Sequence, residues 1–103
     1  MSTTWPEKEK AVARAAFDRA ASAAEKEIIK RHAAYPLESL DDLWNLEQEI
    51  RKWRKEHGYI FQYRYSHLDE CFGICVRRNW LTLENLRGLG EERLQRIRRI
   101  ASS

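Results

Sequence analysis

Helix-breaking and cross-linking residues are scarce in this sequence, which has two prolines, four glycines and two cysteines among 103 residues. So little proline and glycine excludes a collagen-like chain and argues against a disordered one. No apolar run reaches membrane-spanning length, and the first ten residues have neither the apolar core nor the cleavage site of a secretory signal. We therefore expect a helix-rich cytoplasmic protein with no membrane segment.

Motifs that carry chemistry are also missing. Cys71 and Cys75 stand four residues apart, which is neither a redox CxxC pair nor a common zinc spacing, so we interpret them as reduced core residues. His32, His57 and His67 show no metal-ligand spacing, and we interpret each as a surface or capping residue. The catalytic-serine, phosphate-loop and dinucleotide-binding glycine patterns do not occur. We accordingly predict no enzyme activity, no metal and no cofactor.

Charge is abundant but nearly balanced. Charged residues make up 34% of the chain and hydrophobic residues 43%, with a net charge of +3. This mild basic bias permits a nucleic-acid or acidic-protein partner and requires neither. A chain of 103 residues fits one domain with a modest core, so dimerisation would add buried surface.

The strongest pattern lies between residues 40 and 58, where apolar side chains recur at spacings of three and four. They form one narrow seam along a helix: Leu43, Leu46, Ile50, Trp53 and His57. We interpret this seam as an interface. Ser39 followed by Asp42 is the expected start of the helix, and Gly58 is its expected end.

A second face of the same helix lies well over a quarter-turn from the seam, with Trp44 near its centre. Its members are Leu40, Trp44, Glu47, Gln48, Arg51 and Arg54. Tryptophan and arginine are enriched where protein surfaces meet, so this face predicts a second partner. The alternative is that Trp44 packs over the core of its own domain.

A longer helix is predicted before this one. Thr4 can cap it, Pro6 is tolerated in its first turn, and it should run to about Ala34. Its expected seam is Phe17, Ala21, Ala24 and Ile28. Because this helix is thinly apolar, it suits packing along a partner helix better than a place at the centre of a core. Tyr35 and Pro36 end it, and the short connection predicts an antiparallel hairpin with the next helix.

The stretch from Tyr59 to Tyr65 has aromatic residues in strand-like alternation, but nothing else in the chain alternates to pair with it. We interpret it as a connector leading into a helix, with a short sheet across a dimer as the alternative. Ser66 and Asp69 are the expected cap of that third helix. Its expected buried stripe is Leu68, Cys71, Phe72, Cys75 and Val76.

The remaining residues predict two more short helices. Asn79 should end the third helix, and Thr82 should cap a short helix that extends to Arg87. Gly88 should break it, and a last helix should begin near Glu91. The inward residues of that helix should be Leu94, Ile97 and Ile100, and residues 101–103 should fray.

Two interpretations fit the turn from Gly88 to Gly90. A Gly-x-Gly turn between helices resembles the helix-hairpin-helix element of DNA-binding proteins, whose backbone N–H groups contact a phosphate. Arginines follow the turn, but Glu91 and Glu92 occupy the first helical turn, where they would repel phosphate. We favour the other interpretation, two short helices that only pack together, and do not expect nucleic acid as a partner.

Segments across nearly the whole chain resemble the fluorescence recovery protein family of cyanobacteria. They are AAFDRA (15–20), DDLWNL (41–46), Arg54, YRYS (63–66), NWLTLENLRGL (79–89) and the closing LQRI. The resemblance implies an all-α fold, a long antiparallel helical hairpin that forms a dimer and carries a small C-terminal helical head. It also implies a non-enzymatic regulator without a cofactor. That regulator would bind photoactivated orange carotenoid protein, speed its return to the resting form and so end photoprotective quenching at the phycobilisome.

With this resemblance we expect residues 1–58 to form the hairpin and dimerisation region and residues 59–103 the head, within a single domain. The expected dimer interface comprises Leu40, Leu43, Trp44, Glu47, Ile50 and Arg54. The expected partner-binding residues are Trp44, Gln48, Arg51, Arg54 and Glu70. This chain has Glu47 and Gln48 where the family resemblance implies His-Asp, and His67, Asp69 and Glu70 interrupt a helix that is more apolar in the family.

These departures leave three hypotheses. The first is a homodimeric regulator of orange carotenoid protein. The second is a dimer of the same fold that binds a different protein in an organism lacking phycobilisomes. The third is a helix-hairpin-helix nucleic-acid binder.

Overall fold

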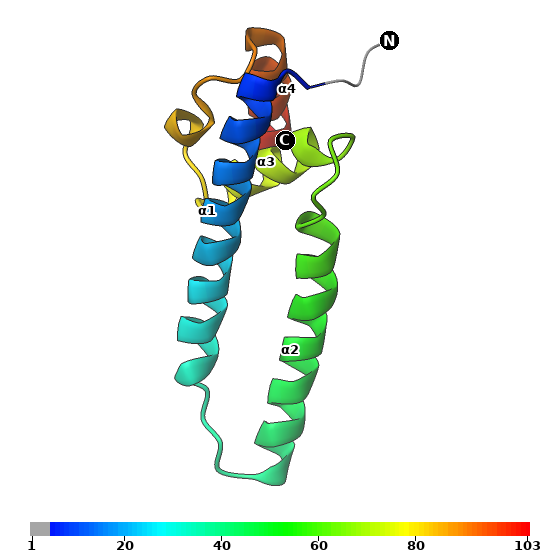
Figure 1. Cartoon of the computed structure of the whole chain (residues 1–103). Helices are drawn as coiled ribbons and strands as arrows, with labels where there is room; N and C mark the ends of the chain where they lie inside the picture. Colours follow the sequence, from blue (N-terminus) through cyan, green and yellow to red (C-terminus); the bar gives the residue numbers. More distant parts are fainter. Residues whose placement is uncertain (1–4) are drawn as a thin grey trace.

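The computed structural model describes residues 5–103, which form an elongated helical molecule of 54 × 25 × 24 Å (Figure 1). Its elements are α1 (Glu7–Ala33), α2 (Leu40–Ile60), α3 (Leu68–Arg77), the 3-10 helix η1 (Leu83–Leu86) and α4 (Glu91–Ser102). No strand occurs among the described residues, so the all-α prediction is confirmed. The expected connector is confirmed from Phe61 onward, where the chain is irregular and turns directly into α3, whereas Tyr59 and Ile60 belong to α2.

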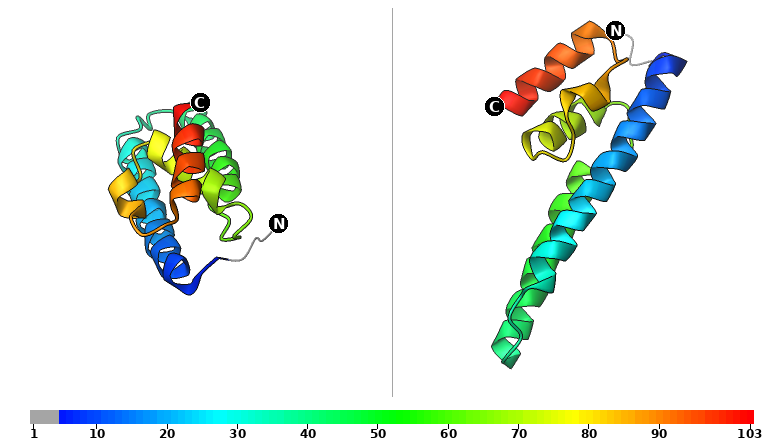
Figure 2. Two further views of the ribbon diagram at one scale, coloured as in Figure 1. Left: turned by 90° about the horizontal axis from the view of Figure 1, so that it is seen from above. Right: turned by 90° about the vertical axis from the view of Figure 1, so that its left-hand side faces the viewer.

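Helices α1 and α2 run alongside each other in opposite directions and are joined by a short loop (Figures 1 and 2). The Ser39 hydroxyl accepts a hydrogen bond from the Asp42 N–H at 3.1 Å, and the Asp42 carboxylate accepts one from the Glu38 N–H at 3.0 Å. These two bonds satisfy backbone N–H groups where α2 begins. The predicted hairpin and the predicted start of α2 are therefore confirmed.

The predicted end of α2 at Gly58 is wrong. The helix continues through Gly58 to Ile60, whose side chain is buried, and the Phe61 N–H donates to the His57 carbonyl at 2.9 Å. Glycine inside a helix costs only about 1 kcal/mol relative to alanine. Burying an isoleucine side chain stabilises by about 1.5–3 kcal/mol, which is enough to carry the helix past the glycine.

The core lies at one end of the molecule, where α3, η1 and α4, here called the head, pack on the N-terminal half of α1 (Figure 2). The largest fully buried side chains are Phe72, Leu68, Leu86, Ile97, Cys71 and Cys75. The predicted stripe on α3 is confirmed, with Val76 only half-buried at its end. Helices α3 and α4 approach closely at Gly73, where a Cβ atom would lie 2.4 Å from Ile100 Cγ2.

Helix α1 takes part in this core, contrary to the prediction that it suits a partner helix better. Its buried residues are Ala13, Ala16, Ala20 and Ala24, so of the predicted seam only Ala24 is fully buried. Small side chains let the larger residues of the head reach the α1 backbone, and those larger residues supply most of the buried apolar area. The predicted cap at Thr4 lies outside the described residues.

The start of α3 differs from the prediction. Its N-cap residue is His67 and not Ser66, and no side chain caps it. The Arg64 carbonyl instead accepts hydrogen bonds from the N–H groups of His67 and Leu68 at 2.8 and 3.1 Å. A turn in the backbone thus replaces the side-chain cap, because burial of the His67 ring fixes the chain at this point.

The other helix boundaries in the head lie closer to the predicted ones. Thr82 caps η1, its hydroxyl accepting from the Asn85 N–H at 3.2 Å, although this helix is 3-10 and ends one residue early. Asn79 and Gly88 both have positive φ, at 64° and 109°, and mark turns after α3 and η1. The predicted fraying is wrong, because α4 extends to Ser102 and the Ser103 carbonyl accepts a hydrogen bond from the Arg77 guanidinium at 2.8 Å.

The opposite end of the molecule is built differently. Here α2 up to Gly58 and the last third of α1, together called the arm, lie side by side beyond the head (Figure 1). Ile60, at the head end of α2, is the one buried residue of that helix. Along residues 5–103, none of the helices combines the length and the apolar character needed to cross a lipid bilayer.

Candidate functional site

An apolar face of α2 is open to solvent. Leu43 and Trp44 are 51% and 56% exposed, and Leu40 and Ile50 are exposed beside them. A shallow groove of about 410 Å³ runs between the side chains of Leu43, Trp44, Leu46, Glu47 and Ile50. Large apolar side chains that cluster in one exposed groove are typical of a protein interaction site. The alternative placement of Trp44 over the core of its own domain is therefore wrong.

Charged side chains border this groove. Glu47 and Arg51 form an ion pair across one helical turn, with Glu47 Oε1 and Arg51 Nη2 2.6 Å apart. Gln48 and Arg54 are exposed on the same helix. The structure thus brings the residues expected on α2 onto one continuous and accessible helix, since no part of the head covers them.

Glu70, the remaining expected partner-binding residue, lies on α3 at the junction with the end of α2. Its Oε1 accepts a hydrogen bond from the Tyr59 hydroxyl at 2.8 Å, and its Oε2 lies 3.4 Å from His67 Nδ1. The hydrogen bond and the negative charge of Glu70 raise the pKa of Tyr59. In this chain Glu70 therefore links α2 to the head.

His67 is not a surface residue, although the surface was one of the two places that the sequence predicts for it; it stands at the N-cap position of α3 and its ring is buried. Its side chain is 8% exposed, and its ring N–H donates to the Ile60 carbonyl at 3.1 Å. Because that carbonyl belongs to the last residue of α2, the histidine satisfies a group that the helix itself leaves free. His67 and Glu70, two of the polar residues that interrupt the sequence of α3, thus join the head to the end of α2, whereas Asp69 pairs within the head.

A second junction was not predicted from the sequence, because its partners are far apart in the chain. The Trp80 indole N–H donates to the Glu27 carboxylate of α1, and Arg78 pairs with Glu56 of α2. These contacts close the head end of a cavity of about 170 Å³ between the two long helices. The only local signal was a tryptophan directly after Asn79, since asparagine is a residue type that adopts positive φ in turns.

His57 stacks inside the arm close to this junction. Its ring centroid is 4.7 Å from that of Trp53 and 4.7 Å from that of Phe61. Burial among these rings lowers the pKa of His57, and the negative charge of Glu25 opposes that effect. The seam predicted on α2 is therefore partly used within one chain at its head end, whereas Leu43 and Ile50 stay exposed.

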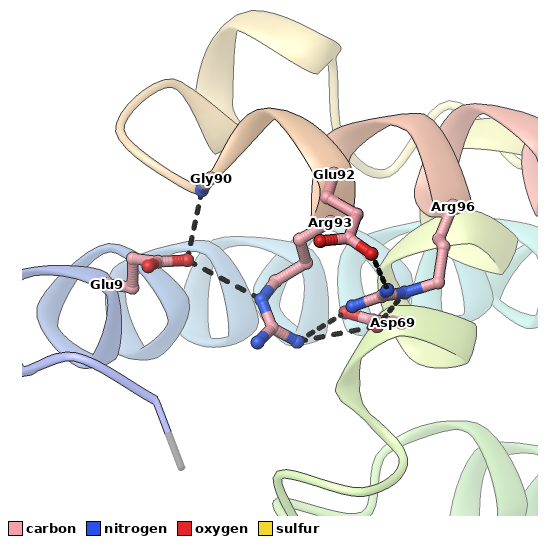
Figure 3. A network of polar contacts seen from close by, with 6 residues as sticks. All are labelled: Glu9, Asp69, Gly90, Glu92, Arg93 and Arg96. Atoms are coloured by element: carbon pink, nitrogen blue, oxygen red, sulfur yellow. Dashed lines mark hydrogen bonds and ion pairs between the residues drawn. The ribbon is translucent and has the colours of Figure 1, made fainter. Parts of the chain in front are cut away.

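The Gly-x-Gly turn is hydrogen-bonded to a carboxylate of the same chain. The Gly90 N–H, at the start of α4, donates to the Glu9 carboxylate of α1 at 3.0 Å (Figure 3). A phosphate bound by a helix-hairpin-helix element would need this N–H group. Because the carboxylate already occupies that position, the geometry favours the packing interpretation of the turn.

The same carboxylate belongs to a network that ties α1, α3 and α4 together (Figure 3). Arg93 lies 3.5 Å from Glu9 and 3.2 Å from Asp69, and its guanidinium lies 3.6 Å from the centre of the Trp5 ring. Arg96 pairs with the same Asp69 at 3.1 Å. Two of the arginines that could serve a nucleic-acid surface are thus used to hold the head together.

The two cysteines are free thiols buried in the head, as predicted. A hydrogen bond with Cys71, reinforced by burial, raises the pKa of the Cys75 thiol. A thiol held in its protonated form is a weak nucleophile. In the described part of the chain, no three histidine, cysteine or acidic side chains are placed to share a metal ion.

Comparison with known proteins gives the family. The family model of the photoprotection regulator fluorescence recovery protein matches residues 5–101. The solved structure of the fluorescence recovery protein from Fremyella diplosiphon is similar over 97% of this chain and 100% of its own, with 29% identity and a TM-score of 0.89. The one from Synechocystis sp PCC 6803 covers the same shares at 22% identity, also with a TM-score of 0.89, and shows the same fold. No curated protein sequence matches the chain significantly.

The family match covers both the arm, with its open face on α2, and the head that packs on α1. The resemblance noted in the sequence is thereby confirmed by the family model and by the fold. The chain belongs to the family of the photoprotection regulator fluorescence recovery protein.

Proposed function

We propose that this protein is a homodimeric regulator that binds photoactivated orange carotenoid protein and accelerates its return to the resting form. The observation that carries the proposal is the open apolar face of α2, with Trp44 exposed at its centre, in a chain of the photoprotection regulator family. A buried cluster of acid, base and nucleophile is not needed for such a role. Specific binding to two states of a partner is sufficient.

The dimer is proposed from the same face. Leu40, Leu43, Trp44 and Ile50 expose apolar surface that a second copy of α2 can cover, and burial of apolar surface drives most protein association. Glu47 and Arg54 contribute charged side chains to the interface. In this arrangement residues 1–58 provide the hairpin and the dimer contact, and residues 59–103 provide a head at each end.

Partner binding is proposed to use Trp44, Arg51 and Arg54 together with Gln48 and the head residue Glu70. The mechanism follows from linkage between binding and conformation. A regulator speeds a conversion only if it binds the transition between the two partner states more tightly than it binds the activated state. An arm that offers arginines around a tryptophan, joined to a head by fixed contacts, could engage two parts of the partner at once.

The test is a titration of this protein into photoactivated orange carotenoid protein while recovery of the orange absorption is recorded. We expect the recovery rate constant to rise with added protein and to saturate. Trp44→Ala should weaken the apparent affinity about tenfold or more, because tryptophans at interface centres dominate binding energy. Ile29→Ala is the matched control, since Ile29 is an equally exposed apolar residue on α1.

Either outcome decides the proposal. Acceleration whose apparent affinity Trp44→Ala weakens and Ile29→Ala leaves intact supports it. An unchanged recovery rate, with the protein verified as a folded dimer by light scattering, would contradict it. The partner would then be a different protein, to be sought by affinity capture from the host.

A further inference from the structure

Seven exposed residues on one face of α2 are arranged symmetrically about Glu47. Leu40 and Arg54 lie seven residues before and after it, Leu43 and Arg51 four, and Trp44 and Ile50 three. Within this set, residues 40, 43, 47, 50 and 54 follow the three-four spacing that keeps side chains on one side of a helix.

This symmetry matters because a two-fold axis relates identical surfaces. When two copies of one helix pack antiparallel across such an axis, residues equally far before and after the centre face each other. With the centre at Glu47, Trp44 of one copy meets Ile50 of the other, and Leu43 meets the stem of Arg51. The groove between Leu43 and Ile50 is then covered by the same groove of the second copy.

The centre of that contact carries charge. Two Glu47 carboxylates would lie next to each other on the axis, and like charges brought together destabilise an interface. Each Glu47 is already paired with Arg51 of its own chain at 2.6 Å, and both side chains are largely exposed and therefore available to a partner, at 60% and 77%. Since Arg51 lies one helical turn from the axis, it also approaches Glu47 of the other copy.

We propose that Glu47 and Arg51 of both copies form a four-charge cluster at the two-fold axis, and that this cluster selects a second copy of this chain as the dimer partner. The inference rests on the proposed function, because it requires the α2 dimer. Two acids and two bases then alternate around the axis. A partner that lacked either charge would leave an unbalanced pair at the centre of the interface.

Charge reversal tests the cluster directly. Glu47→Arg alone places four positive charges at the axis, and Arg51→Glu alone places four negative charges there. Each variant should raise the dimer dissociation constant at least about tenfold, because like charges brought together at an interface oppose association. For Arg51→Glu, about 0.5 M NaCl should restore part of the association, since salt screens exposed charges.

The decisive measurement uses a mixture of the two single variants. An equimolar mixture of the Glu47→Arg and Arg51→Glu variants should form a heterodimer with affinity close to that of the wild type, because one chain brings two bases and the other two acids. The double variant Glu47→Arg with Arg51→Glu should regain the homodimer. Light scattering gives the mass, and a tag on one variant identifies the mixed species.

The control pair lies on the head. Glu84 and Arg87 form an ion pair of 3.0 Å with side chains 74% and 83% exposed. Glu84→Arg and Arg87→Glu should leave the dimer unchanged. Far-ultraviolet circular dichroism checks that all variants stay helical.

The outcomes separate this inference from the proposal on which it rests. If the single variants dimerise like the wild type, or if the mixture fails to pair, the charge cluster is overturned while the dimer stands. If the wild type is a monomer throughout the micromolar range, the proposed dimer and the cluster both fail. Loss of both homodimers with recovery in the mixture supports the inference.

Discussion

The head and the arm of this molecule use the same kind of helix in opposite ways. In the head, Phe72, Leu68 and Ile97 are completely buried, and α3 approaches α4 so closely that a glycine is needed between them. In the arm, Leu43, Trp44 and Ile50 expose apolar surface that the chain itself does not cover. The head is therefore stabilised by contacts within the chain, whereas the arm leaves apolar surface exposed.

The polar contacts of the two regions differ in the same way, because those of the head are mostly buried and those of the arm are exposed. In the head, Arg93 and Asp69 are mostly buried and belong to a network that joins three helices. In the arm, the pairs Arg31–Glu27 and Arg51–Glu47 link residues one turn apart on a single helix and are exposed. Exposed pairs of this kind contribute about 0.3–0.5 kcal/mol each, so they shape the surface and add little stability.

The largest expected effect is in the head. Phe72→Ala should lower the free energy of unfolding by about 3–5 kcal/mol, because it removes a completely buried ring and leaves a cavity. Urea unfolding followed by circular dichroism measures the change. Trp44→Ala, which removes a larger ring from the arm, should change the unfolding of dilute protein by less than about 0.5 kcal/mol. A loss of similar size for both variants would erase the distinction between the two regions.

The next largest expected effect is on dimer formation through the arm. Leu43→Glu should shift the protein toward monomer, because it introduces a charge into the apolar face of α2. The head should stay folded, so the near-ultraviolet circular dichroism of its aromatic residues should persist. Leu83→Glu, at an exposed leucine of η1, is the control. A dimer mass that Leu43→Glu leaves unchanged would show that another surface forms the dimer.

Replacing a glycine by alanine should change the free energy of unfolding in opposite directions in the two regions. Gly73→Ala should lower the free energy of unfolding by about 1–3 kcal/mol, because the added Cβ would lie 2.4 Å from the side chain of Ile100. Gly58→Ala should raise it by about 0.5–1 kcal/mol, because nothing lies within 4 Å of a Cβ atom there and alanine favours the helix. Melting temperatures of the two variants give the comparison, and equal signs would contradict it.

The smallest effect depends on pH. Burial lowers the pKa of His57 from its ordinary value of 6.5, so the folded chain binds fewer protons there than the unfolded chain. The sign follows: stability should fall slightly as the pH drops below about 6.5, since protons then favour the unfolded state. The titration midpoint of the His57 ring, measured by NMR, should lie below 6.5. A midpoint above that value would mean that the charge of Glu25 dominates.

The arm shows how far local sequence reasoning reached. The Ser39–Asp42 cap and the three-four spacing of α2 located this helix, because both signals act within a few residues. The end of α2 was wrong by two residues, since burial of Ile60 against the head decided it. Whether Trp44 faced its own core or solvent was open, because an exposed interface and a buried helix face have the same periodicity.

The head shows where tertiary structure took over. The stripe from Leu68 to Cys75 was readable from its spacing, and so was the cap at Thr82. The contacts that lock the head in place join residues far apart in the chain: Glu9 with Gly90, Glu27 with Trp80, and Asp69 with Arg93. Charged and aromatic residues of this kind look like ordinary surface in a sequence, since nothing local distinguishes a paired charge from a solvated one.

By itself, the sequence determined the number and order of the helices, most of the head core and the family, because helix periodicity, capping and segment resemblance are local properties. Only the tertiary structure decided that the alanines of α1 enter the core, that His67 is buried and that the turn before α4 holds a carboxylate. Those features depend on which distant segments meet. It also decided that the apolar face of α2 stays open, because the head packs on the N-terminal half of α1 at the other end of the molecule.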